Sequence, residues 1–414
     1  MAAMIEIYPE RPLDEGVEAG SQIGRPGVLA HTEGLLQHPY RRETLGAMAR
    51  EELAQMVMAR LQTPPDYGLY PELEDLYPER VDYIRGLAQG AECSLEDAAI
   101  YSYLTYRDEI DTWYHVYQLE LEPTHCSGVF LTGPDGVLGA HSVESGPPEC
   151  PPEYRYRKPR PYEIIRSQRP LRARLTLKKP RTGYIQEWGV TNEKGVGCFA
   201  AVSCGVLLDE PIEDTWPIGP VPLLRFAHNV DHLAELYRRY NLFNWGRASQ
   251  LYADISGNAM VVEKSYRRIG IRMLGNSDVL WCTEGHFETP EMGAYIRAKR
   301  LEFLEKTGRH LGAGDMQYAT DCAVRFTHIG ALCHEPWGKG YQHMRRILTD
   351  HAPFPRAVCR HGGPDTAPYD KTITMDSIFR DATHNRSYHR HWIPWKRFCC
   401  EVPEDVVQYP RIPA

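Results

Sequence analysis

The sequence predicts an α+β fold in which stacked antiparallel sheets are covered by helices. Three observations support this prediction. The first part of the chain, up to about residue 120, has the hydrophobic period of helices. After Pro123 the pattern changes to short apolar runs separated by turn residues, which is typical of hairpins. From there onward hairpins and helices alternate, as expected when helices pack on antiparallel sheets.

The helical prediction rests on three segments. Residues 43–61 and 71–91 each carry apolar residues at a helical spacing, so each has one face to bury. A third helix is predicted after Ser94, because a serine followed three residues later by an acidic residue, here Asp97, caps a helix N-terminus. This helix is expected to run to about Tyr106.

The strand prediction rests on three hairpins. The segment CSGVFLTGPDGVLGAHSVES (126–145) contains a Gly-Pro-Asp-Gly turn between two apolar runs. A second hairpin is predicted over 182–208 with its turn at 192–195, and a third from Leu251 with its turn at 256–258. Further helices are predicted over 222–240, 291–310 and 336–349, and further strands around ITMDSIF, residues 373–379.

The composition excludes some function classes. The chain has 414 residues, of which 42% are hydrophobic and 25% charged, as in ordinary soluble proteins. Its net charge of -8 disfavours a nucleic-acid partner. No run of about 18 apolar residues exists, so a membrane span is not expected. The N-terminus lacks the pattern of a secretory signal, which favours a cytoplasmic location.

The cysteines and histidines do not predict a metal or cofactor site. The eleven cysteines are irregularly spaced without a CxxC pair, so they are expected to be reduced and not to bind structural zinc. No carboxylate cluster accompanies the histidines of the second half. The histidines considered for a metal site are His286, His351, His361, His384, His389 and His391. Phosphate-binding glycine loops and the Gly-x-Ser-x-Gly elbow of serine hydrolases are absent from the sequence.

A basic segment spans residues 154–181. It holds eleven Lys or Arg residues and a single acidic residue, Glu163, together with several tyrosines and prolines. One interpretation is a solvated, proline-stiffened loop. The other is a loop over the active site, in which residues such as Tyr156 and Arg157 attract an anionic group of the substrate. The same segment also suits a contact with another subunit in a homo-oligomer.

Cys126 is the residue whose position points to chemistry. It opens a predicted strand directly after the connector that follows Pro123. If the peptide bond before it is cut, the freed α-amine has an ordinary pKa of about 7.7–8 and accepts the thiol proton. The thiolate then attacks an amide carbonyl without a separate histidine. The alternative is a buried cysteine with a packing role, which is the commoner use of this residue.

Four sequence blocks resemble the acyl-coenzyme A:6-aminopenicillanic acid acyltransferase family of N-terminal nucleophile hydrolases. The first is the helical pair YPERVDYIRGLAQGAECSLEDAAIYSYLTY (77–106). The second is the hairpin at 126–145, and the third is GYIQEWGVTNEKGVGCFAAV (183–202). The fourth comprises LYADISGNAMVVE, CTEGHF (282–287) and TDHAPFPRAVCRHGG (349–363), in the family's order.

The resemblance implies a four-layer αββα sandwich made as one precursor. Family members cut themselves before the nucleophilic cysteine, which here gives a helical chain 1–125 and a nucleophile-bearing chain 126–414 that stay paired. They hydrolyse or transfer acyl groups of small acyl-amide or peptide-like substrates through an acyl-cysteine intermediate. No cofactor, metal, nucleic-acid partner or membrane contact is expected for such an enzyme from this sequence.

The resemblance also assigns roles to particular residues. Gln250 is the amide nearest to the position of the family's oxyanion asparagine, and His141 stands where a second asparagine is usual. Glu144 replaces the aspartate that orients groups around the nucleophile's amine, and His125 precedes the predicted cut. The last two assignments are Arg360 and His361, which form either a structural hydrogen-bonding pair or a contact to a substrate carboxylate.

Two other functions fit parts of the sequence. The departures at His125, Glu144 and Gln250 also suit an uncleaved member of the same fold that acts as a binding protein. A papain-like cysteine protease tolerates an internal Cys126 but requires a separate catalytic histidine.

Overall fold

The computed structural model describes most of the helices and strands of the chain. The described residues are 12–37, 48–63, 76–118, 125–145, 163–165, 174–176, 192, 194–203, 216–217, 223–240, 248–265, 268–307, 316–336, 338–352, 357–360, 373–384, 386–391 and 404–408.

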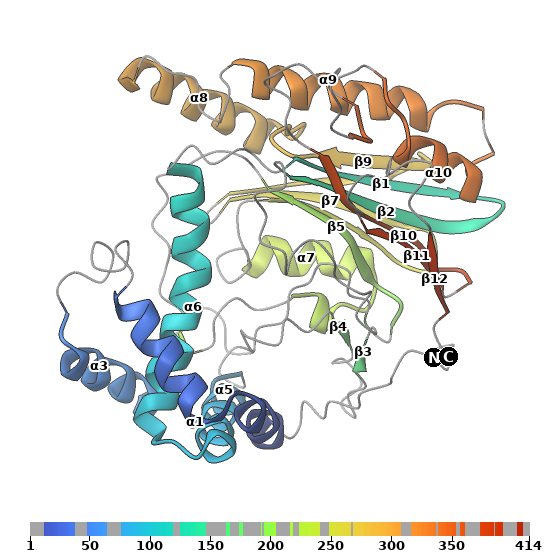
Figure 1. Ribbon diagram of the computed structural model, residues 1–414. Coiled ribbons are helices and arrows are strands. Elements are labelled where there is room, and N and C mark those ends of the chain that lie inside the picture. The colour runs from blue at the N-terminus through green and yellow to red at the C-terminus, as the bar shows by residue number, and fades with distance from the viewer. Residues whose placement is uncertain are drawn as a thin grey trace.

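The N-terminal helices form a unit with its own apolar core. This helical unit consists of α1 (Pro12–Gln37), α3 (Arg50–Gln62), α5 (Leu76–Ala91) and α6 (Leu95–Gln118) (Figure 1). The predicted cap of α6 is confirmed, because the Asp97 amide donates to Ser94 Oγ at 3.0 Å. α6 is longer than predicted, since it continues past Tyr106 to Gln118.

α1 was not predicted, because its glycines and Pro26 are poor helix formers. The structure shows what these glycines do. A Cβ on Gly86 of α5 would lie 2.0 Å from the Leu13 carbonyl oxygen of α1, and one on Gly16 would lie 2.1 Å from the Tyr83 oxygen. The two helix backbones therefore touch, which only glycine permits. Gly24 has a φ of 68°, and α1 kinks there.

Two antiparallel sheets of six and four strands form the centre of the rest of the fold. In the first, the strand order is β12-β11-β10-β2-β1-β9, and in the second it is β5-β6-β7-β8. The first sheet comprises β1 (His125–Gly133), β2 (Gly136–Ser145), β9 (Val279–Thr283), β10 (Ile373–Asp381), β11 (Arg386–His391) and β12 (Asp405–Gln408). The second comprises β5 (Gly197–Ser203), β6 (Ala248–Ala253), β7 (Ala259–Lys264) and β8 (Ile269–Met273).

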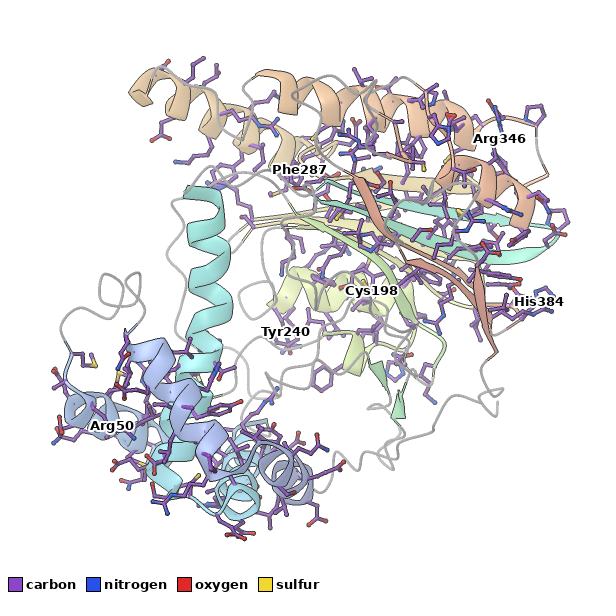
Figure 2. The ribbon with its side chains drawn as sticks, viewed as in Figure 1. Arg50, Cys198, Tyr240, Phe287, Arg346 and His384 are labelled. Atoms are coloured by element: carbon purple, nitrogen blue, oxygen red, sulfur yellow. The ribbon has the colours of Figure 1, made fainter. Side chains whose placement is uncertain are left out.

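The sheets stack face to face between two helical layers. Phe130 and Leu280 of the first sheet share a core with Leu251 and Val261 of the second. On its outer face the first sheet packs against α9 (Met316–Cys333) and α10 (Tyr341–Leu348) (Figure 1). The second sheet packs against α7 (Val230–Tyr240) in a core to which Cys198 and Tyr240 both belong (Figure 2). These layers form an αββα sandwich, as predicted.

The remaining elements complete this picture. The short helix η2 (Leu223–Phe226) precedes α7, and α8 (Pro290–Thr307) follows β9. Inside the basic segment, β3 (Glu163–Ile165) and β4 (Arg174–Thr176) pair as a separate two-stranded sheet. This pairing is more regular than a loop, while the segment's relation to an active site stays a prediction.

The predicted hairpins are largely confirmed. β1 pairs with β2, and β6 with β7, as antiparallel hairpins around the predicted turns. The turn at 192–195 is confirmed by the bond from the Gly195 amide to the Asn192 oxygen at 3.0 Å. The first strand of that hairpin lies outside the described residues. α9, β8 and β9 were not predicted.

Two aromatic residues join the helical unit to the sandwich. Trp216 lies far along the chain but is fully buried in the helical unit's core, where its Nε1 donates to Ser102 Oγ at 3.3 Å. Its ring packs edge-on against Tyr103 at 5.5 Å. Tyr77 of α5 packs against this core and also against the core under α7.

Candidate functional site around Cys126

Cys126 is the second residue of β1, a strand with neighbours on both sides. Its side chain is only 8% exposed and belongs to the core between the two sheets. The face is confirmed by Gly128, because a Cβ there would lie 2.5 Å from Ala200 Cβ and 3.6 Å from Leu251 Cδ2 of the opposite sheet. Side chains two residues apart share a face, so Cys126 also points toward the second sheet.

The facing sheet places Ser249 at the level of Cys126. A Cβ on Gly128 would touch Leu251, and a Cβ on Gly257, in the turn after β6, would lie 3.2 Å from Thr132 Oγ1. Later residues of β1 therefore lie against later residues of the β6 hairpin, so β6 runs in the same direction as β1. Cys126 lies two residues before Gly128, and Ser249 lies two residues before Leu251. Because Gly128 and Leu251 face each other, Cys126 and Ser249 lie at the same level of the two strands. Ser249 is 1% exposed, and its hydroxyl has no hydrogen-bond partner among the described residues.

Glu284 lies beside Cys126 at the end of β9. Its amide donates to the Cys126 carbonyl oxygen at 3.0 Å, and its side chain is fully buried. Burial raises the pKa of the Cys126 thiol well above its ordinary value, and the negative charges of Glu284 and then Glu144 raise it further. Arg325 acts in the opposite direction and lowers this pKa. In the uncut chain the thiol is therefore protonated at neutral pH.

Glu144 occupies the other face of the first sheet. In the strand register it lies opposite His125, the residue before the predicted cut. Its carboxylate accepts a hydrogen bond from Ser142 Oγ at 2.5 Å and an ion pair from Arg325 Nη1 of α9 at 3.0 Å. The side chains of Glu144 and Arg325 are both fully buried. Glu144 and Arg325 therefore act on Cys126 from the outer face of the first sheet, whereas Glu284 acts from the end of the neighbouring strand β9.

His141 lies on the same face as Cys126. It is directly opposite Gly128, one strand away, and is 3% exposed. Burial lowers the pKa of His141 to about 3, so the imidazole is neutral at neutral pH. A neutral imidazole offers one N–H donor and one acceptor.

Gln250 points away from Cys126. Alternation along β6 directs Leu251 into the layer between the sheets and Gln250 toward α7. There its Oε1 accepts a hydrogen bond from the Tyr237 hydroxyl at 2.9 Å. The structure therefore does not bring Gln250 together with the nucleophile, and its expected role as oxyanion donor has no geometric support.

The remaining predicted residues are placed only in part. Arg360 is buried, and its amide donates to Thr374 Oγ1 at 2.7 Å. Its Nε donates to the Ala357 oxygen at 3.3 Å, which is the structural type of arrangement. Tyr156, Arg157 and His361 lie outside the described residues, as does the side chain of His125.

Three residues of this site were missed by sequence reasoning. Ser249 is next to the predicted Gln250, so counting the strand alternation from Leu251 could have found it. Glu284 lies in the block CTEGHF, although no role was assigned to it. Arg325 belongs to α9, a helix that was not predicted, so no signal pointed to it.

Within the described part of the chain, no three His, Cys, Asp or Glu side chains are grouped as a metal would require. Some of the histidines considered for metal have acidic partners. His286 pairs with Glu288 at 2.5 Å, and His384 with Asp381 at 2.8 Å. The described cysteines, Cys126 and Cys282 among them, are free thiols. No described helix is both long and apolar enough to cross a membrane.

No family model matches the chain. Among curated proteins, one subunit of the light-independent protochlorophyllide reductase of Ephedra altissima is 28% identical over 127 residues. That match covers 30% of this chain and only 23% of the relative, so it spans a small part of either protein.

Solved structures give low-level likenesses. A mutant of the conjugated bile acid hydrolase from Clostridium perfringens is 12% identical, with a TM-score of 0.37. The match covers 68% of this chain and 92% of the hydrolase chain. A second variant of that hydrolase is 14% identical with the same coverages and TM-score. Penicillin V acylase from Agrobacterium tumefaciens is 12% identical, with coverages of 64% and 83% and a TM-score of 0.35. At these values the likenesses carry no argument about this chain.

Proposed function

We propose that this chain is a cysteine amidohydrolase or acyltransferase of the N-terminal nucleophile type. It is cut between His125 and Cys126 and acts on a small acyl-amide or peptide-like substrate through an acyl-Cys126 intermediate. The observation that carries the proposal is the place of Cys126. The thiol lies near the start of an internal strand of an αββα sandwich, between two sheets, with Glu284 and Ser249 at its level.

The cut explains how so buried a thiol becomes reactive. In the intact strand the Cys126 pKa is raised by burial and by two carboxylates. A freed α-amine has an ordinary pKa of about 7.7–8 and is within reach of the thiol of its own residue. The negative charges of Glu284 and Glu144 oppose a lone thiolate, but they stabilise the ammonium formed when the amine takes the thiol proton.

The reaction then proceeds in two acyl transfers. Cys126 Sγ bonds to the substrate carbonyl carbon, and the carbonyl oxygen becomes an oxyanion. The C–N bond breaks, and the leaving amine takes the proton from the α-ammonium. Water or a second amine next attacks the thioester and releases Cys126. For the oxyanion donor, Ser249 replaces Gln250 in this proposal, because its buried hydroxyl faces the nucleophile's layer.

The substrate side of the proposal keeps the sequence-based residues. The basic segment 154–181, with Tyr156 and Arg157, supplies positive charge for an anionic group of the substrate. Arg360 has a structural hydrogen-bond arrangement, so of this pair His361 is the second candidate for the contact. A homo-oligomer would bring the basic segment of one subunit against another.

The test is the N-terminal sequence and intact mass of the purified protein. Two chains that correspond to 1–125 and 126–414, both absent in Cys126→Ala, are the expected result. A single uncut chain that does not hydrolyse a panel of N-acyl p-nitroanilides would overturn the proposal.

One observation favours a second function, an uncleaved binding protein of the same fold. The pKa of Cys126 is raised in the uncut chain, so a thiol that is never processed stays protonated and unreactive. Labelling with an iodoacetamide probe separates the two functions. Labelling at Cys126 that is lost in Cys126→Ala supports the enzyme, whereas equal labelling of both proteins supports the binding protein.

A further inference from the structure

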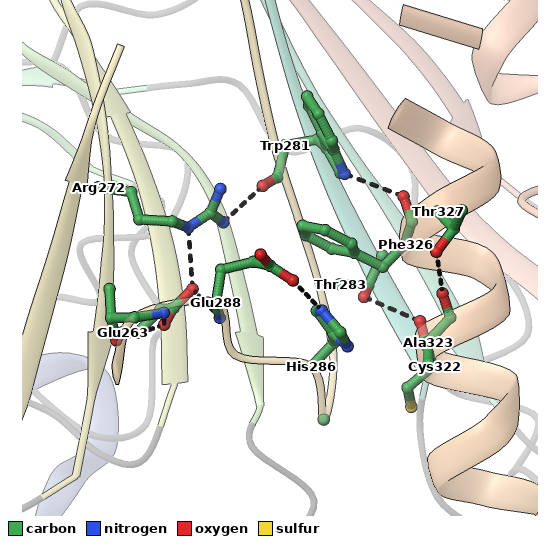
Figure 3. A network of polar contacts seen from close by, with 12 residues as sticks. Glu263, Arg272, Trp281, Thr283, His286, Glu288, Cys322, Ala323, Phe326 and Thr327 are labelled. Carbon is green, nitrogen blue, oxygen red and sulfur yellow. Dashed lines mark hydrogen bonds and ion pairs between the residues drawn. The ribbon is translucent and has the colours of Figure 1, made fainter. Parts of the chain in front are cut away.

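Two hydrogen-bonded anchors flank the segment that carries Glu284. At its start, Arg272 of β8 donates through Nη2 to the Trp281 carbonyl oxygen at 2.8 Å (Figure 3). At its end, the Glu263 carboxylate of β7 accepts the amides of Glu288 at 3.0 Å and Thr289 at 2.8 Å. β9 is the edge strand of the first sheet, and β8 is the edge strand of the second. The anchors thus join the two sheets along one side.

The two anchors are parts of a single ion pair. Arg272 Nε donates to Glu263 Oε1 at 3.0 Å, and Glu263 Oε2 accepts a further bond from Thr289 Oγ1 at 2.7 Å. Glu263 is fully buried, whereas Arg272 is 19% exposed. Such a carboxylate is costly to bury, and here several donors compensate it. A displacement of either partner therefore removes a contact at each end of residues 281–289, while β9 stays paired with β1 and Arg300 Nη2 still donates to the Gly285 oxygen at 2.7 Å.

A third contact ties the pair to α9. The Arg272 guanidinium lies over the Phe326 ring at 5.6 Å, and His286 stacks on the same ring at 4.1 Å. Phe326 is adjacent to Arg325, the cation that lies behind Cys126. The Trp281 indole also donates to the Phe326 oxygen at 2.9 Å (Figure 3). The pair thus holds the Glu284 segment against the layer that contains the nucleophile.

From this geometry we infer that Glu263 and Arg272 are positioning residues that hold the Glu284 carboxylate beside Cys126. The inference rests on the proposed function, in which Cys126 is the nucleophile and Glu284 stabilises its ammonium. Neither positioning residue touches the reacting atoms. They act through the segment 281–289, whose Glu284 amide bonds the Cys126 oxygen.

A direct charge effect of Arg272 and a positioning effect through Glu284 predict shifts of opposite sign in the pKa of the Cys126 thiol. Removal of a cation by itself raises a thiol pKa, whereas displacement of the Glu284 carboxylate lowers it. The groups that act on this thiol among the described residues are Glu284 and Cys282 from the β9 end, Glu144 from β2 and Arg325 from α9. The direction of the Cys126 pKa shift in the Arg272 variant therefore distinguishes a positioning role of Arg272 from a direct effect of its charge.

The experiment measures the pH dependence of Cys126 alkylation by iodoacetamide in the full chain, followed by peptide mass spectrometry. In Arg272→Met the midpoint is expected to fall by about one pH unit. Arg268→Met is the matched control, because Arg268 lies over the Tyr295 ring at 3.9 Å and is expected to leave the midpoint unchanged. In a Glu284→Gln background, Arg272→Met is expected to add no shift.

An unchanged or raised midpoint in Arg272→Met overturns the inference, and so does a lowered midpoint that persists in the Glu284→Gln background. If Arg272→Met does not fold, Arg272→Lys gives the same decision, because it keeps the charge but loses the paired geometry. The N-terminus is sequenced in the same samples. An uncut wild-type chain counts against the proposed function, whereas the direction of the midpoint shift decides the positioning role.

Discussion

The helical unit and the two-sheet sandwich bury different kinds of groups. Among the described residues of the helical unit, the buried polar side chains are Thr32 and Thr105, and its closest contacts are between helix backbones. The sandwich fully buries Glu144, Glu263 and Arg325. Buried charge opposes folding unless it is paired, and even paired it is a weak source of stability. The comparison teaches that close packing stabilises the helical unit, whereas the sandwich contains buried charges that add little stability and are typical of functional sites.

The largest expected effect is on the nucleophile. Cys126→Ala is expected to abolish the cut and the iodoacetamide labelling of the peptide that contains position 126, because this thiol is the proposed nucleophile. Cys198→Ala is the control, since Cys198 is equally buried but packs in the core with α7. Intact mass reads both effects. A variant that lacks Cys126 and still appears as two chains would contradict the predicted cleavage.

The next effect separates two buried serines near the nucleophile. We expect Ser249→Ala to slow acylation of Cys126 by p-nitrophenyl acetate about 10²–10³-fold, because an oxyanion donor is lost. Alkylation by iodoacetamide forms no such oxyanion and should keep its rate. Ser127→Ala is the control, since Ser127 is buried without a hydroxyl partner but faces the opposite side of β1. Equal slowing of acylation in both variants would remove Ser249 from the site.

The third effect belongs to the helical unit. Gly86→Ala would place a Cβ 2.0 Å from the Leu13 oxygen, so α1 must move away from α5. We expect the free energy of unfolding in urea to fall by about 3 kcal/mol. Gly34→Ala in α1 meets nothing within 4 Å and should raise it by up to about 1 kcal/mol. If Gly86→Ala is as stable as the wild type, the backbone contact is not what holds these helices.

The smallest effect is a pH dependence of the free energy of unfolding, which is caused by the buried His141 of the sandwich. Its pKa is about 3 in the folded chain against about 6.5 when unfolded, so the unfolded state binds the proton first. The stability contributed by neutral His141 is therefore fully present above the unfolded-state pKa of about 6.5. It is lost as the pH falls from this value toward the folded-state pKa of about 3.

Between about pH 7 and about pH 5 the wild type should lose about 2 kcal/mol more than His141→Gln. Urea unfolding at the two pH values measures this difference. His351→Gln, at an exposed position, is the control and should behave like the wild type. The same loss in His141→Gln as in the wild type would show that another group is responsible.

Much of the fold followed from local patterns, and the exceptions have physical reasons. The hairpin at 126–145 was predictable because alternation and a Gly-Pro-Asp-Gly turn are local signals. α1 was missed because Gly16 and Gly20 weaken a helix in isolation and help it only when α5 lies against them. The assignment of Gln250 as oxyanion donor has no geometric support, because the sequence shows an amide but not the face of β6 that it occupies.

The sequence by itself determined that Cys126 lies at the start of a hairpin's first strand, one residue after its beginning at His125, because turn residues and alternation act over a few positions. It also predicted layered sheets with helices, since the hydrophobic period changes along the chain. Only the tertiary structure decided which side chains surround the thiol. Ser249, Glu284 and Arg325 come from β6, the end of β9 and α9, and the packing of these separate elements sets which residues lie at the level of Cys126.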